Sequence, residues 1–257
     1  PNDPLSRDCN IVMVIRHPNV EPRIHLGFPG GFGDLEIYRQ EVVDGIHDEW
    51  VDLTPGSTKW RYTYHGRLFE YNPNYPNEGS RFNQINIMAQ KLAETPYTRR
   101  AQAVTWYTWF DNYIDDPPCL QRIWARLVPT EEGLALNFHF TMRSWDAFKA
   151  AFMNLWAFSD LQRMLIERIE LAQKINQNDE EKILIGPIIA FGDSFHIYGK
   201  DFADPDLPMS FQGFLGSLRK RSFEERTISS VDPIVQSEFE EARRRIEEEK
   251  KKKGGEG

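Results

Sequence analysis

The most constraining feature of the sequence is a strictly alternating stretch that is followed directly by a long amphipathic one. From residue 134 to 142 every second residue is large and apolar, and Ala, Asn, His and Thr occupy the positions between. Side chains of a β-strand alternate between two faces, so this pattern predicts a strand with one buried face. From about residue 146 to about residue 173 the apolar residues recur at helical spacing, which predicts a long helix with a buried stripe.

Other segments predict further strands and helices in the same domain. Runs rich in Val, Ile, Trp and Tyr indicate strands at residues 10–16, 101–109 and 120–128, and helical spacing indicates helices at residues 35–50 and 84–92. A chain of 257 residues can bury one large core. We therefore expect an α+β fold, in which a mixed β-sheet is packed by the long central helix, in a single domain at residues 1–236. Residues 237–257 are densely charged and are expected to form an exposed helix that frays into a tail.

Net charge and cysteine content argue against several classes of protein. A net charge of −8 disfavours nucleic acid and membrane surfaces as partners, because both attract clustered positive charge. No apolar run approaches the roughly 20 residues of a membrane span. Only Cys9 and Cys119 occur, so we expect no disulfide framework and a cytoplasmic setting. No Cys/His spacing matches a metal site, and no metal is expected.

Cys119 is a candidate nucleophile because of what surrounds it in the sequence. Pro117 and Pro118 rigidify the chain before it, and a predicted strand comes immediately after it, which would hold the sulfur at a fixed point. A thiol becomes nucleophilic when nearby positive charge lowers its pKa. Arg143 leaves the alternating strand on its polar face and could supply that charge. The alternative is that Cys119 is a small core residue.

Three polar groups are candidates for holding an anionic substrate. Arg143, Ser144 and Asp146 stand where the long helix is expected to begin. Either the Arg143 guanidinium and the Ser144 hydroxyl form a phosphate clamp with the free helix N–H groups, or Ser144 and Asp146 are simply an N-cap. Arg99 and Arg100 precede a predicted strand and are either surface charge or part of a site. His196 and Tyr198 share one side of an extended segment and are either a structural pair or substrate ligands.

Taken in order, these motifs resemble the thymidylate synthase family. The matching set is Arg99 and Arg100, then Pro117-Pro118-Cys119, then Arg143-Ser144-x-Asp146, then Asn154, then His196-x-Tyr198. Segments 46–50 and 64–67 resemble the family's Ile-Trp-Asp-Glu-Trp segment and its Tyr-Gly loop, and Asn83-Gln84-Ile85 resembles the helix that leads to the arginine pair. The resemblance covers roughly residues 20 to 200. Pro-Pro-Cys-Leu and Ser-x-His-Ile-Tyr are closest to the short archaeal branch.

The resemblance implies an enzyme of the methyltransferase kind that converts dUMP to dTMP with 5,10-methylenetetrahydrofolate as co-substrate. Cys119 would add to C6 of the pyrimidine, with Tyr64 assisting proton removal from C5 and Asn154 reading the amide edge of the ring. Residues implied to hold the nucleotide are Arg23, Arg99, Arg100, Arg143, Ser144, His196 and Tyr198. Those implied at the folate are Asp146, His47 and Trp50. The family's sheets pack across a homodimer interface, and Arg99 and Arg100 would reach the partner's phosphate.

Departures from the family pattern leave the product and the base open. Leu120 stands where many members have His, and His47 stands where the family has a Trp beside the reacting methylene group. The family's catalytic glutamate has two candidates, Glu36 and Glu41. A pyrimidine nucleotide hydroxymethylase, in which water replaces the hydride and the substrate is dCMP, CMP or dUMP, is therefore the alternative.

Overall fold

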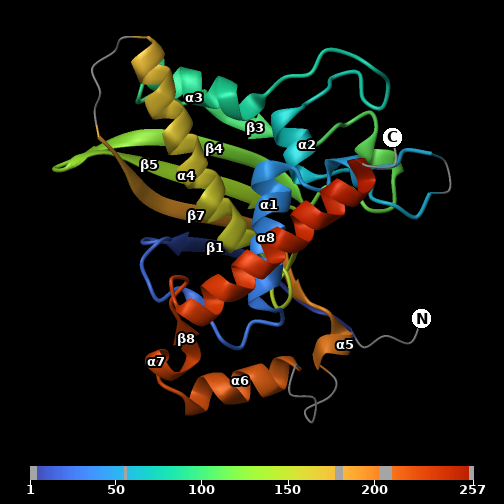
Figure 1. The fold of residues 1–257 in the computed structure, drawn as a ribbon, viewed down its shortest axis with the longest axis vertical. Helices are drawn as coiled ribbons and strands as arrows, with labels where there is room; N and C mark the ends of the chain where they lie inside the picture. Colours follow the sequence, from blue (N-terminus) through green and yellow to red (C-terminus); the bar gives the residue numbers. More distant parts are fainter. Residues whose placement is uncertain (1–4, 55–56, 177–181, 203–209, 255–257) are drawn as a thin grey trace.

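A six-stranded mixed sheet forms the centre of the protein (Figure 1). The computed structural model describes residues 5–54, 57–176, 182–202 and 210–254. Strands run in the order β1–β7–β5–β4–β3, and the short β6 pairs with β7. β5 is antiparallel to β4 and parallel to β7. The strands are β1 (Arg7–Ile15), β3 (Gln102–Val104), β4 (Leu120–Thr130), β5 (Gly133–Met142), β6 (Trp145–Asp146) and β7 (Ile183–Ile197).

Helices pack on one face of this sheet. The longest, α4 (Ala151–Ile175), crosses the strands, with α1 (Phe32–Asp44) and α3 (Gln84–Glu94) against it (Figure 1). Phe138 and Phe140 on β5 meet Phe158 and Leu161 on α4 in the main core. The remaining elements are β2 (Ile24–His25), η1 (Asp48–Trp50), α2 (Tyr64–Phe69), η2 (Asp111–Tyr113), α5 (Gly199–Phe202), α6 (Phe211–Lys220), α7 (Phe223–Arg226), β8 (Thr227–Ile228) and α8 (Pro233–Gly254).

The expected α+β fold with a long central helix is confirmed, and the alternating strand is β5. Burial along β5 alternates at every residue, as the sequence pattern requires. On the opposite sheet face, Val12 and Val14 are 62% and 55% exposed. This sheet face therefore leaves apolar side chains in contact with solvent. Among the described residues, no helix has the length and apolar character needed to cross a bilayer.

Three predicted boundaries are wrong, each for a local reason. α1 stops at Asp44 because Gly45 takes a left-handed conformation at φ 66°, and only residues 48–50 continue as a 3₁₀ turn. β3 ends at Val104, where the chain turns toward the Asp111 carboxylate, which accepts a hydrogen bond from the Tyr107 amide. The long helix starts at residue 151 instead of 146, because Asp146 pairs into the sheet and its Oδ1 accepts the amides of Phe148 and Lys149.

The C-terminal helix is not the exposed element that its charge suggested. α8 starts at Pro233 and packs obliquely across α1 (Figure 1). Its apolar side chains Val235, Phe239, Ala242 and Ile246 are buried. Arg243 donates from Nε to the buried Glu36 at 2.9 Å. Every third or fourth residue is therefore apolar and faces α1, a spacing hidden among the charged residues. Residues 255–257 of the expected tail lie outside the described part of the chain.

We predict that Phe239→Ala destabilises the protein by about 3 kcal/mol, because it removes a buried ring that packs against Trp156 and leaves a cavity. Glu240→Ala, at the neighbouring exposed position, should change the free energy of unfolding by less than about 0.5 kcal/mol. Denaturant unfolding of the two variants measures this difference. Equal effects would mean that α8 is not docked in solution.

Candidate active site

A cavity of about 240 Å³ opens where α1, α2 and the chain before β4 meet. Its lining combines two carboxylates with aromatic rings. The lining residues are Tyr38, Glu41, Trp60, Arg61, Tyr62, Thr63, Tyr64 and Asp116. We call this space the reaction cavity. Acidic and phenolic groups in one concave site are the usual components of acid–base chemistry.

Cys119 is half-buried and does not itself line this cavity, but it is close enough to Tyr38, Tyr64 and Asp116, which do, to interact with them electrostatically. The pairing of β4 with β5 aligns Leu120 with Met142, so the residues before β4 and after β5 become neighbours. Arg143 holds the cysteine loop in three ways. Its amide donates to the Cys119 carbonyl at 2.9 Å, and its guanidinium donates to the carbonyls of Pro118 and Pro117 at 3.0 and 2.6 Å.

The pKa of Cys119 moves in the direction opposite to the sequence-based expectation. Burial raises the pKa of the thiol, and Asp116 adds to this effect. Arg143 and a hydrogen bond with Ser144 act to lower it, as expected, but they do not offset the burial. Arg143 has part of its donor capacity committed to the proline carbonyls, and the thiol is therefore predominantly protonated at neutral pH.

Three tyrosines surround the cysteine loop and stay neutral at pH 7. Burial raises the pKa values of Tyr38, Tyr62 and Tyr64 above the ordinary value. The Tyr64 hydroxyl accepts a hydrogen bond from the Leu120 amide at 3.2 Å, and Tyr62 makes one to the Cys119 backbone. Two phenol groups are therefore hydrogen-bonded to the backbone at Cys119 itself and at the next residue, Leu120.

Asn154 is buried on α4 and is separated from the reaction cavity by Tyr38. Its Oδ1 accepts from Trp145 Nε1 at 3.0 Å, which orients the amide, and its Nδ2 donates to the Tyr38 hydroxyl at 2.5 Å. Tyr38 lines the cavity and Asn154 does not. Asn154 therefore acts on the cavity through the Tyr38 hydroxyl, to which it is hydrogen-bonded.

The structure distinguishes the two candidate glutamates. Glu36 accepts from Arg39 and Arg243, and these partners lower its pKa despite the burial. Glu41 lines the reaction cavity, and burial, with Asp48 adding to it, raises its pKa to about 7. Only Glu41 combines access to the cavity with a pKa suited to proton exchange at neutral pH.

An aromatic cluster of His47, Trp50 and Trp60 stands next to Glu41. His47 Nδ1 lies 3.2 Å from Glu41 Oε2, and its ring stacks on Trp50 with centroids 3.7 Å apart. Trp60 meets the Trp50 ring edge-on at 5.3 Å and lines the cavity. Trp50 and Trp60 are 36% and 40% exposed, which makes them an accessible surface for a flat ligand.

None of the predicted nucleotide ligands lines the reaction cavity. Tyr198 lies near the cysteine, since burial and then the charges of Asp146 and Cys119 raise its pKa. Its ring meets that of His196 edge-on at 4.8 Å. Arg99 and Arg100 have exposed side chains. The predicted clamp of Arg143 and Ser144 has no helix N-terminus behind it, because β6 intervenes before α4.

Arg23 is the predicted ligand that the structure places in a different setting. Its guanidinium donates to Glu21 at 3.0 Å and to Ser159 at 3.1 Å, and it stacks over Trp156 at 4.0 Å. Arg23, Trp156 and Ser159 line a separate cavity of about 170 Å³. Arg23 would have to exchange the Glu21 carboxylate for a phosphate before it could serve the nucleotide.

Sequence reasoning assigned no role to six residues of the reaction cavity: Tyr38, Trp60, Arg61, Tyr62, Thr63 and Asp116. Tyr38 and Glu41 are three residues apart on one face of α1, a spacing that could have paired them. Tyr62 and Trp60 lie in an irregular segment whose course no periodicity predicts. Among the residues that the structure describes, no cluster of His, Cys, Asp and Glu could hold a metal ion.

Comparisons with known proteins agree on one family. The sequence profile described as thymidylate synthase matches residues 31–206. Two archaeal proteins named as candidate thymidylate synthases are each 30% identical: one from Methanopyrus kandleri over 66% of this chain and 68% of that protein, and one from Methanosarcina acetivorans over 75% and 74%. The structure of thermostable thymidylate synthase A from Bacillus subtilis superposes with a TM-score of 0.56 at 14% identity, over 85% of this chain and 73% of that one. The fold is therefore that of a thymidylate synthase.

We predict that Glu41→Gln makes the protein's stability less dependent on pH. A pKa that rises from 4.5 to about 7 on folding stabilises the native state below pH 4.5, and this contribution is lost as the pH rises through about 7. The loss corresponds to about 3 kcal/mol at pH 8. Thermal unfolding at pH 5 and pH 8 should show a smaller drop for Glu41→Gln than for the wild type. Equal drops would show that Glu41 titrates normally.

Proposed function

The chain belongs to the thymidylate synthase family, and we propose that it transfers the one-carbon unit of 5,10-methylenetetrahydrofolate to C5 of dUMP, with Cys119 as the nucleophile. The observation that supports this best is that Glu41, Tyr64 and Asp116 line one cavity, while Cys119 lies beside Tyr64 and Asp116 with Arg143 and Ser144 next to its sulfur. A nucleophile, a titrating carboxylic acid and an anion-binding pair are what addition to a nucleotide ring requires.

The first step forms a bond between Cys119 Sγ and C6 of the pyrimidine, and the electron pair of the C5–C6 double bond moves toward C5. Because burial raises the thiol pKa, the proton must leave as the bond forms, and the nearby Asp116 carboxylate is the acceptor that we propose. C5 then attacks the methylene carbon of the folate as one of its two bonds to nitrogen breaks. Tyr64 assists removal of the C5 proton, and the electron pair left behind expels tetrahydrofolate by breaking the second carbon–nitrogen bond, which leaves an exocyclic methylene group. Hydride from the folate adds to that methylene carbon as the Cys119 thiolate leaves C6, which gives dTMP and dihydrofolate.

Arg143 and Ser144 would bind the phosphate. Arg23 would become a third phosphate ligand if the phosphate replaced the Glu21 carboxylate that it now binds. His196 and Tyr198 would hold the sugar. Asn154 would recognise the base through Tyr38, since it orients that hydroxyl. Glu41 would exchange protons with the ring, because its pKa of about 7 makes both protonation states accessible.

For the folate, we propose that its flat rings stack on the exposed cluster of Trp50 and Trp60, with His47 beneath. Asp146 would face the pterin. Its Oδ1 accepts two backbone amides, so the carboxylate is held in one orientation for ligand contact.

We also propose a homodimer formed by the helix-free sheet face. Val12 and Val14 are exposed there, and an accessible apolar face of this kind marks an interface. A twofold interface would pair this face with itself. Arg99 and Arg100, which are exposed, would then reach the phosphate in the partner's site.

A hydroxymethylase is the second candidate, and it depends on His47. After C1 transfer the exocyclic carbon is electrophilic, and hydride from the folate makes methyl whereas water makes hydroxymethyl. His47 is a polar ring in contact with Glu41, which could hold a water molecule where an apolar ring would exclude it.

We predict that Cys119→Ser abolishes turnover of dUMP while nucleotide binding and folding persist. A hydroxyl is a much poorer nucleophile than a thiol at neutral pH. Steady-state kinetics and calorimetric titration with dUMP measure the two properties, and Cys9→Ser is the matched control. Retention of more than a few per cent of wild-type kcat would rule out Cys119 as the nucleophile.

The proposal that Arg99 and Arg100 serve the partner's site can be tested by mixing inactive subunits. Arg100→Ala and Cys119→Ser homodimers should each be inactive, whereas mixed dimers contain one site with both groups. Equal mixing and exchange should restore about a quarter of wild-type activity, since half of the dimers are mixed and half of their sites intact. No recovery, despite subunit exchange shown by mass spectrometry, would contradict the shared site.

The product distinguishes the two candidate functions. We predict that wild-type protein converts dUMP to dTMP and forms dihydrofolate in equal amount, because the hydride comes from the folate. Ultraviolet absorbance measures dihydrofolate, and mass spectrometry identifies the nucleotide. Hydroxymethyl product without dihydrofolate would establish the second candidate, and His47→Trp should then shift the product toward methyl.

A further inference from the structure

His196 lies next to an irregularity in the sheet that directs a second polar side chain toward it. β1 and β7 pair Asp8 with His196. The register shifts just beyond this pair, where Asn10 stands opposite both Asp193 and Ser194. Two residues opposite one form a β-bulge, which redirects the side chains of the strand that carries the extra residue. Ser194 and His196 are two residues apart, so their side chains lie on the same side of β7.

Ser194 links the Asp8 carboxylate to the His196 ring. Its Oγ donates to Asp8 Oδ2 at 2.8 Å, and the same oxygen lies 3.3 Å from His196 Nδ1. The carbonyl oxygen of Ser194 lies 3.2 Å from that nitrogen as well. A carboxylate and a carbonyl can only accept hydrogen bonds, so the single hydroxyl hydrogen points to Asp8 and Nδ1 supplies the hydrogen to Ser194. Both Ser194 oxygens therefore favour a hydrogen on Nδ1.

The other ring nitrogen of His196, Nε2, remains as an acceptor that a ligand can reach. In a neutral imidazole one nitrogen carries the hydrogen and the other accepts. Nε2 makes no hydrogen bond among the described residues, yet it is not one of the described side-chain atoms that are enclosed without a partner. It therefore keeps contact with solvent. Tyr198, whose ring meets that of His196 at 4.8 Å, is 43% exposed, so this end of β7 is open to a ligand.

We propose that Asp8 and Ser194 are positioning residues that hold neutral His196 in the tautomer with hydrogen on Nδ1, so that Nε2 accepts a hydrogen bond from a hydroxyl group of the ligand. Both residues act through His196. A ligand whose hydroxyl is missing or esterified cannot donate to Nε2, so the site selects nucleotides with a free sugar hydroxyl. This selection rests on the function proposed above, in which His196 and Tyr198 hold the sugar, whereas the tautomer is a property of the protein alone.

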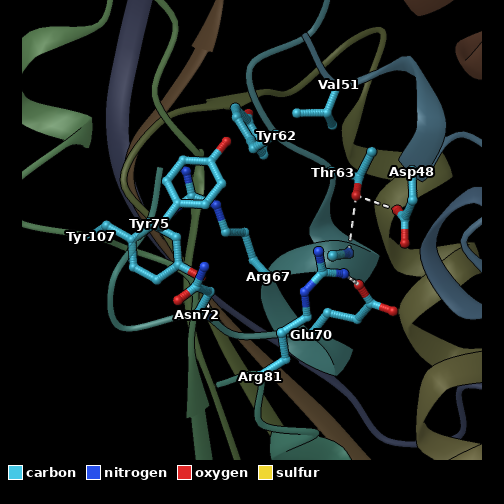
Figure 2. A pocket seen from close by; sticks show the side chains of 11 residues that line it. Asp48, Val51, Tyr62, Thr63, Arg67, Glu70, Asn72, Tyr75, Arg81 and Tyr107 are labelled. Atoms are coloured by element: carbon cyan, nitrogen blue, oxygen red, sulfur yellow. Dashed lines mark hydrogen bonds and ion pairs between the residues drawn. The ribbon is translucent and has the colours of Figure 1, made fainter. Parts of the chain in front are cut away.

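His65 provides an internal reference, because a carboxylate reaches its ring directly. His65 Nδ1 lies 2.6 Å from Asp48 Oδ2, and the other oxygen of Asp48 accepts from Thr63 Oγ1. Figure 2 shows Asp48 and Thr63 joined in this way at the wall of a separate cavity of about 210 Å³, which His196 does not line. The Asp48 carboxylate favours hydrogen on Nδ1 of His65, so the tautomer of His65 should not respond to changes at Asp8.

Nitrogen-15 NMR of the ligand-free protein at pH 8, where an ordinary histidine is neutral, measures the tautomer. Wild-type His196 should be predominantly in the Nδ1–H form, the reverse of free histidine in water. Asp8→Ala frees the Ser194 hydroxyl to donate to Nδ1, and Ser194→Ala removes an acceptor, so each should lower the ratio of Nδ1–H to Nε2–H about five-fold. Asp193→Ala removes the exposed carboxylate next to Ser194 and should leave the ratio unchanged. His65 should keep its tautomer in all three variants.

Calorimetric titration tests the selection of the hydroxyl. 2′,3′-Dideoxyuridine monophosphate, which lacks the sugar hydroxyl of dUMP, should bind the wild type at least ten-fold more weakly than dUMP. Ser194→Ala should weaken dUMP several-fold and leave the dideoxy nucleotide unchanged. Wild-type His196 with hydrogen on Nε2, or an unchanged ratio in either folded variant, would overturn the roles of Asp8 and Ser194. Equal affinity for the two nucleotides would overturn the selection, whereas no binding of dUMP beside the expected tautomer would count against the proposed function instead.

Discussion

The pairing register between β4 and β5 is the constraint on which the candidate site depends. Leu120 opposite Met142 makes Cys119 and Arg143 neighbours although 23 residues separate them in the chain. A shift by one residue would turn the apolar face of β5 toward solvent, so the buried core itself holds the register. Arg143 then fastens the proline segment by its carbonyls. The position of the sulfur is thus a consequence of core packing, because the loop that carries Cys119 is fastened to two paired strands of the core.

Burial governs the chemistry of the groups around that sulfur. It raises the pKa values of Cys119, Glu41 and Tyr64 together, so the cavity is rich in protons at neutral pH. Such a site favours reaction steps in which protons move as bonds form. Glu36, on the same helix as Glu41 but paired with Arg39 and Arg243, has its pKa lowered and serves the docking of α8. Two carboxylates five residues apart thereby differ in role through their partners alone.

Periodicity and short motifs were enough to predict the main elements of the fold and the family. The alternation of β5 and the stripe of α4 need only a buried face, and both were predicted correctly. The predicted boundaries were wrong where local features of single residues decide them: Gly45 ends α1, and the Asp146 side chain makes α4 start later than predicted. The buried face of α8 was hidden because four apolar residues are scattered among many charges. The pKa of Cys119 required knowing its burial as well as its neighbours, and the roles of Tyr62 and Trp60 required the path of an irregular segment.

The central claim is that Cys119 attacks the pyrimidine and that the folate supplies carbon to C5. The most direct measurement uses 5-fluoro-dUMP with 5,10-methylenetetrahydrofolate, because fluorine at C5 cannot leave as a proton and the intermediate should persist. Mass spectrometry of the intact protein and of its peptides should show one nucleotide and one methylenetetrahydrofolate joined through Cys119, because the folate cannot be expelled while fluorine stays at C5. An unmodified protein under saturating ligands, or an adduct carried by Cys9, would contradict the account.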